Sequence, residues 1–119
     1  MIQIFGTSKD KVTRAAQRFF TDRGVKFQFV ELKQKGLSKG ELASVAKAVG
    51  GMQALYDAKG THAKDRGLQY SAPTGERLAE ILEADPMLLL IPIVRDGTKA
   101  AVGDAPAVWK AFADAAKKI

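Results

Sequence analysis

The sequence predicts a single α/β domain over residues 1–119, in which a mixed four-stranded sheet carries helices on both faces. Three observations lead to this fold class. The chain opens with the pattern strand, helix, strand, which implies a parallel strand pair joined by a right-handed crossover. It closes with two strands around an Asp-Gly turn and then a helix. Between these units lies a helical insertion of about residues 38–85.

The opening unit rests on apolar periodicity. Residues 2–5 read Ile-Gln-Ile-Phe and are followed by Gly-Thr-Ser, which predicts a short buried strand that opens into a polar loop. Asp10 is placed to cap the next helix, which Gly24 ends. The apolar residues of this helix recur at helical spacing and are Val12, Ala15, Ala16, Phe19 and Phe20. Residues 25–32 alternate with period two and predict the second strand.

The insertion begins with a helix. Ser38 and Glu41 form a capping-box pattern ahead of an apolar stripe. Residues 57–73 are polar and punctuated by glycine, so we expect an irregular surface segment with at most one helical turn. The sole histidine, His62, falls there, and we expect a plain loop residue. A further helix is expected over residues 74–85.

The closing unit follows from two apolar runs and one periodic segment. Residues 93–95 and 100–102 flank the Asp96-Gly97 dipeptide and predict a hairpin. A last helix is expected from Pro106, with an apolar face made of Val108, Ala111, Phe112 and Ala115. This element order is that of the thioredoxin fold.

Composition excludes several classes of chemistry. The chain has no cysteine, which rules out disulfides, thiolate nucleophiles and thiol redox cycles within it. A lone histidine without cysteine cannot build the usual zinc sites, so we expect no metal. The chain shows neither a charged leader ahead of an apolar stretch nor an apolar run long enough to span a bilayer, and we expect a cytoplasmic protein.

Several motifs, taken in order, resemble the arsenate reductase (ArsC)/Spx family of thioredoxin-like proteins over nearly the whole chain. They are MIQIFG (1–6), GVKFQF (24–29), LSKGEL (37–42), KGT (59–61), GL (67–68), DPMLLLIPIV (85–94), VG (102–103) and Trp109. The resemblance implies a reactive cysteine at the start of the first helix, where the helix dipole lowers a thiol pKa and favours an oxyanion.

The family's functional residues do not carry over to this chain. Asp10 stands at the position of the family thiol, and a shift of one residue would place Lys9 there instead. Thr13 replaces the second cysteine of redox-sensing members. Ile91 replaces the anion-binding arginine, so no bidentate donor is present there. Two basic positions of the insertion remain only as lysines, at Lys59 and Lys64.

The surroundings of Asp10 can still be predicted. The resemblance implies a cis peptide bond at Pro92, beside the loop that precedes the first helix. Thr7, Ser8 and Thr13 would line a small polar pocket in which Asp10 repels an anion. We favour Asp10 as a helix cap over an acid, a base or a phosphoacceptor, because no paired carboxylate or metal-ligand cluster lies near it in sequence.

Two functional hypotheses follow from the resemblance. The first is a non-catalytic binding or regulatory module, as Spx-like members are, with an acidic protein as partner. Its basic residues are Lys9, Lys11, Arg14 and Arg18 on or beside the first helix, although such a face can also serve solubility alone. The second is an enzyme that binds glutathione or a small oxyanion and uses the thiol of that cofactor.

Nucleic-acid binding is disfavoured in spite of the net charge of +6. The phenylalanines fall at inward periodic positions, which leaves few aromatic rings for base stacking. They are Phe5, Phe19, Phe20, Phe27, Phe29 and Phe112.

Overall fold

The computed structural model of the chain describes residues 1–117, so the last two residues of the predicted domain lie outside the described part. Its sheet has the strand order β2-β1-β3-β4. The strands are β1 (Ile2–Gly6), β2 (Phe27–Glu31), β3 (Ile93–Asp96) and β4 (Lys99–Val102). β1 pairs parallel with β2 and antiparallel with β3, and β4 is antiparallel to β3. The predicted mixed four-stranded sheet is therefore confirmed.

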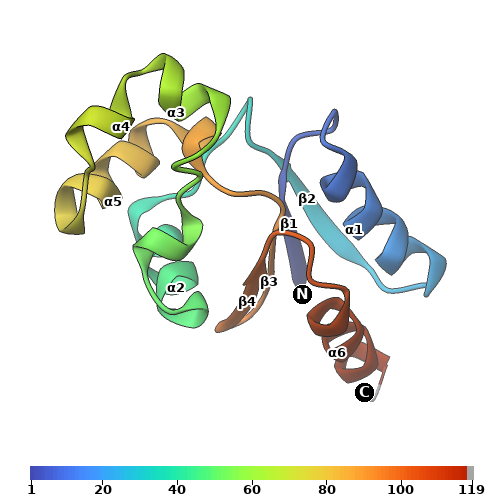
Figure 1. Cartoon of the computed structure of the whole chain (residues 1–119). Coiled ribbons are helices and arrows are strands. Elements are labelled where there is room, and N and C mark those ends of the chain that lie inside the picture. Colours follow the sequence, from blue (N-terminus) through green and yellow to red (C-terminus); the bar gives the residue numbers. More distant parts are fainter. Residues whose placement is uncertain (118–119) are drawn as a thin grey trace.

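Helices cover both faces of this sheet, as Figure 1 shows. α1 (Lys11–Asp22) and α6 (Pro106–Lys117) lie on one face, and α2 (Lys39–Val49) lies on the other with the rest of the insertion. Because successive strand residues point to opposite faces, β1 contributes Ile4 to the core under α1 and α6 and Phe5 to the core under α2. The two cores are the two apolar layers that this alternation requires.

The insertion contains more helix than its sequence pattern indicates. After α2 come η1 (Met52–Leu55), α3 (Thr61–Asp65), α4 (Leu68–Ser71), α5 (Gly75–Ala84) and η2 (Pro86–Leu88). The expectation of at most one helical turn over residues 57–73 is wrong, because α3 and α4 both lie there. Each is anchored by one buried apolar residue, Ala63 or Leu68, and helices this short show no apolar period.

Two helix faces differ in detail from the predicted ones. On α1, Thr13 is buried and Ala15 is exposed. On α6 the buried residues are Trp109, Phe112 and Ala113, whereas Ala111 and Ala115 are exposed. Burial of the large indole rotates α6 away from the stripe that its alanines indicate, because the indole has far more apolar area to remove from water.

The capping box that begins α2 is present. The Ser38 hydroxyl accepts from the Glu41 backbone N–H, and the Glu41 carboxylate accepts from the Ser38 backbone N–H at 2.9 Å. That backbone N–H is the main reason why the pKa of Glu41 lies below its ordinary value.

The predicted core phenylalanines are buried or pack against the core. Within the described residues no helix combines the length and the apolar character that crossing a membrane requires.

Candidate functional site

In the loop between β1 and α1, the backbone of Gly6 lies close to the side chain of Thr13. β1 ends at Gly6, which the sheet register places opposite Glu31 of β2. A Cβ at Gly6 would overlap the Thr13 side chain, which is fully buried in the first turns of α1. The absence of a side chain at Gly6 therefore allows α1 to start directly against the end of its own strand.

Asp10 caps α1, as predicted. Its carboxylate Oδ2 accepts from the Thr13 backbone N–H and from the Thr13 hydroxyl, each at 2.8 Å. Its own backbone N–H donates to the Thr7 carbonyl oxygen at 3.0 Å. One carboxylate oxygen thus satisfies a free N–H of the helix start and a hydroxyl that has no access to water.

A second carboxylate, that of Glu31, accepts a hydrogen bond from the same loop. Glu31 Oε2 accepts from the Ser8 backbone N–H at 2.9 Å, while Glu31 Oε1 is buried without a hydrogen-bond partner among the described residues. Sequence reasoning did not single out Glu31. A topological signal was available, because Glu31 ends the parallel neighbour of β1 and the carboxyl ends of parallel strands share one edge of a sheet.

Pro92 lies directly before β3, the antiparallel neighbour of β1. The Ile91–Pro92 peptide bond is cis, as the family resemblance implied. Pro92 directly precedes Ile93, which the register pairs with Phe5, the residue before Gly6. Ile91 is half-buried and packs against the core on the α2 face, so the position of the family arginine offers no donor to the loop.

The predicted site residues therefore separate into three groups. Thr7, Ser8, Asp10, Thr13 and Pro92 surround the end of β1, where Thr7 is also buried. Lys59 and Lys64 are exposed in the insertion, and no hydrogen bond or ion pair between described residues joins them to the loop.

The third group lies on the outside of α1 and of the loop before it. Lys9, Lys11, Arg14 and Arg18 are exposed. None of the ion pairs found within residues 1–117 involves them. Lys11, Arg14 and Arg18 are thus exposed, as their helical spacing predicted.

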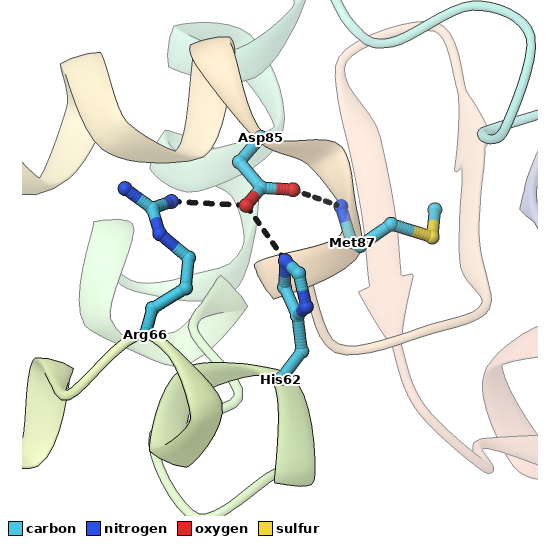
Figure 2. A network of polar contacts seen from close by, with 4 residues as sticks. All are labelled: His62, Arg66, Asp85 and Met87. Carbon is cyan, nitrogen blue, oxygen red and sulfur yellow. Dashed lines mark hydrogen bonds and ion pairs between the residues drawn. The ribbon is translucent and has the colours of Figure 1, made fainter.

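The insertion holds a polar cluster of its own, drawn in Figure 2. Asp85 Oδ2 contacts His62 Nε2 at 2.7 Å and accepts from Arg66 Nη1 at 2.9 Å, while Oδ1 accepts from the Met87 backbone N–H. Partial burial raises the pKa of Asp85, but the hydrogen bonds and charge of its partners outweigh it, so the pKa lies below its ordinary value. His62 is thus a residue of α3 whose imidazole Nε2 contacts the Asp85 carboxylate, and the expectation of a plain loop residue is wrong.

Comparison with known proteins identifies the family pattern. A model of the ArsC family matches residues 5–112. Three solved structures resemble the chain closely in shape. The first is a Bacteroides fragilis protein described as ArsC family related, with a TM-score of 0.83 and 15% identity over 93% of this chain and 96% of that chain. The second is arsenate reductase from Vibrio cholerae, with a TM-score of 0.80 and 20% identity over 92% of this chain and 95% of that chain. The third is an arsenate reductase (ArsC) related protein from Brucella melitensis, with a TM-score of 0.67 and 23% identity over 93% of this chain and 92% of that chain. At these identities the likeness concerns the fold. No curated protein matches the sequence closely enough to count as a relative.

Proposed function

The chain belongs to the ArsC family and has no cysteine, and from that premise we propose that it is a non-catalytic binding or regulatory module. In this proposal the fold of the family is kept as a scaffold, and the outer face of α1 contacts an acidic protein partner. We also propose that the protein is cytoplasmic.

The observation that carries the proposal is the state of the loop before α1. Asp10 stands where the resemblance places the family thiol, and its carboxylate is engaged with the Thr13 N–H and hydroxyl. A carboxylate can form neither an arsenic–sulfur bond nor a disulfide. The Ser8 N–H is also engaged, by Glu31. The Ser8 and Thr13 N–H groups, which could otherwise hold an oxyanion, therefore already have acceptors from within the chain.

The exposed cations support a protein partner. Lys11, Arg14 and Arg18 follow one side of α1, and the exposed Lys9 lies in the loop before this helix. Exposed cations on a helix face speed the encounter with a surface of opposite sign and select against like-charged proteins.

Affinity capture from native cytosol tests this binding role. We expect the wild-type chain to retain an acidic protein, and we expect Arg14→Glu with Arg18→Glu to lose it. The matched control is Lys33→Glu with Lys99→Glu, which changes the net charge equally at exposed positions away from α1. Retention by all three proteins, or by none, would contradict the proposal.

An enzyme that uses bound glutathione with a small oxyanion is the second candidate. The cis Pro92 and the small polar residues around Gly6 favour it. The carboxylates of Asp10 and Glu31 weigh against it, because both lie where an anion would enter. We expect no saturable heat on titration with arsenate or reduced glutathione, and arsenate reduction by the chain with glutathione would instead establish this candidate.

The variant Asp10→Cys separates loss of the thiol from loss of the wider site. We expect it to remain inactive in arsenate reduction, because Ile91 still provides no donor for the oxyanion. Activity of this variant comparable to that of a family reductase would show that the cysteine alone was missing.

A further inference from the structure

The outer side of α5 carries a regular acidic surface. Glu76, Glu80 and Glu83 are exposed there, and none takes part in the ion pairs found within residues 1–117. The small, half-buried Ala79 lies among them. The four positions are spaced i, i+3, i+4 and i+7, so they share one side of the helix. We refer to these four residues as the acidic face.

The outer side of α1 repeats this arrangement with the opposite charge. Lys11, Arg14 and Arg18 are exposed and unpaired in the same part of the chain, and the exposed Ala15 lies among them. Their spacing is again i, i+3, i+4 and i+7. These four residues form the basic face.

The two faces match in one relative orientation. When the helices run antiparallel, every basic residue meets a glutamate at the same axial level and the two alanines meet each other. The facing pairs are Lys11 with Glu83, Arg14 with Glu80, Ala15 with Ala79 and Arg18 with Glu76. In a parallel arrangement, Arg14 would face Ala79 and Ala15 would face Glu80, so the central charges would not meet. The small alanine side chains let the two helices approach closely at the centre of the contact.

The acidic face also borders an apolar depression. Glu76, Glu80, Glu83 and Ala79 form one wall of a groove of about 220 Å³ between α5 and α2, with Leu42 and Met52 among its lining residues. Lys39 on the α2 side also lines this groove, and its charge repels a basic helix. The incoming helix must therefore lie toward α5, where the carboxylates are.

The basic and acidic faces cannot meet within one molecule, because α1 and α5 lie on opposite sides of the sheet (Figure 1). We propose that a second copy of this chain docks its acidic face on the basic face of the first, so that copies associate head to tail through antiparallel α1 and α5. The contact joins two different surfaces, so it leaves one of each free and extends into open chains or closes into rings. The inference rests on the proposed use of α1 as a contact surface.

The net charge of +6 opposes association, but it acts over a longer range than the contact. At ~0.1 M salt the screening length is about 10 Å, so repulsion between whole molecules is reduced more than attraction between charges in contact. Exposed ion pairs are individually weak. We therefore expect association only at high protein concentration, with an apparent association constant that falls by about tenfold or more when salt is raised from ~0.1 M to ~0.5 M.

Sedimentation equilibrium of the full chain tests the proposal. For the wild type we expect an average mass that rises with protein concentration at moderate salt. Arg14→Glu with Arg18→Glu should remove this rise, although it lowers the net charge from +6 to +2 and so reduces general repulsion. The control with the same charge change, Lys33→Glu with Lys99→Glu, should still associate. Circular dichroism verifies that each variant is folded.

Mixing gives the decisive comparison. The first variant, Arg14→Glu with Arg18→Glu, keeps an intact acidic face. The second variant, Glu80→Lys with Glu83→Lys, keeps an intact basic face. Neither should associate alone, but an equimolar mixture should, because each supplies the surface that the other has lost. A mixture whose mass equals the average of its separate components would overturn the proposal.

The outcomes also separate this inference from the proposed function. A wild-type chain that stays monomeric at all concentrations and at both salt levels overturns the self-association. Capture of an acidic protein that depends on Arg14 and Arg18 would then still support the proposed function. Conversely, self-association through these faces without capture of any other protein would leave the contact in place and overturn the role for an external partner.

Discussion

Two aspartates at junctions of the fold make opposite use of the same functional group. Asp10 begins α1 and binds uncharged donors of Thr13, three residues away. Asp85 lies between α5 and η2 and contacts two side chains that are distant in sequence. One is His62 of α3, 23 residues away, and the other is Arg66, which directly follows α3 and is 19 residues away. Asp10 organises a local turn, whereas Asp85 connects two segments of the insertion.

The difference separates a locally capped turn from a polar cluster that joins distant segments. The loop where the resemblance places the family thiol is a locally capped turn in which the Ser8 and Thr13 N–H groups have acceptors within the chain. The ion-pair network lies in the insertion, on side chains that are between about one fifth and one half exposed. We therefore expect changes in the loop to cost more stability than changes in the cluster, and only the cluster to respond strongly to salt.

The largest effect is expected at Gly6. Gly6→Ala places a Cβ against the buried Thr13 side chain, so α1 has to move away from its strand. We expect a loss of about 1–3 kcal/mol in the free energy of unfolding, measured in urea. Gly40→Ala is the matched control, because nothing lies near its added Cβ. It should be neutral or should stabilise α2. Equal losses at both glycines would show that the loop is not tightly packed.

A smaller loss is expected at Asp10. Asp10→Ala removes the acceptor of the Thr13 N–H and of the buried Thr13 hydroxyl, at a cost of ~1 kcal/mol. Asp10→Asn keeps one acceptor oxygen and should recover most of the stability. Asp22→Ala, at the exposed end of the same helix, serves as control. An unchanged unfolding midpoint for Asp10→Ala would refute the capping role.

The smallest loss, ~0.5 kcal/mol, is expected for Asp85→Asn, because the ion pairs of Asp85 are partly exposed. The effect should depend on pH. The pKa of Asp85 in the folded protein lies below its ordinary value of 3.8. The charged carboxylate therefore stabilises the folded protein above pH 3.8, and this stabilisation is lost as the pH falls through the folded pKa. In urea unfolding, the free energy of unfolding of Asp85→Asn should lie below that of the wild type at pH ~5, and this gap should shrink below pH ~4.

Added salt should also reduce the stability difference between Asp85→Asn and the wild type. Asp104→Asn, at an exposed position, is the control, and its stability difference from the wild type should depend on neither pH nor salt. A difference that stays constant from neutral to strongly acidic pH would assign the role of Asp85 to its shape and not to its charge.

The parts of the fold that could be predicted are those with local signals. The period-two run of β2, the capping box at Ser38 and the Asp-Gly hairpin each lie within a few consecutive residues, and each is present. The cis bond at Pro92 has no local signal and was predicted from the family resemblance alone.

What could not be predicted depends on residues that meet only after folding. His62 reaches Asp85 across 23 residues, and nothing near His62 in sequence indicates an acidic partner. Glu31 meets Ser8 across 23 residues through the parallel register of β1 and β2. α3 and α4 are too short for an apolar period to appear, and the face of α6 follows the burial of Trp109.

We propose that side chains of the chain itself, those of Asp10 and Glu31, occupy the loop where the family resemblance places an oxyanion site. The most direct measurement is an NMR titration of the full chain with arsenate and with reduced glutathione, following the backbone amides of Ser8, Asp10 and Thr13. The Glu41 amide, capped in a similar way at the start of α2, serves as internal reference. We predict that none of the three amides shifts more than that of Glu41. Saturable shifts confined to Ser8, Asp10 and Thr13 would contradict the claim.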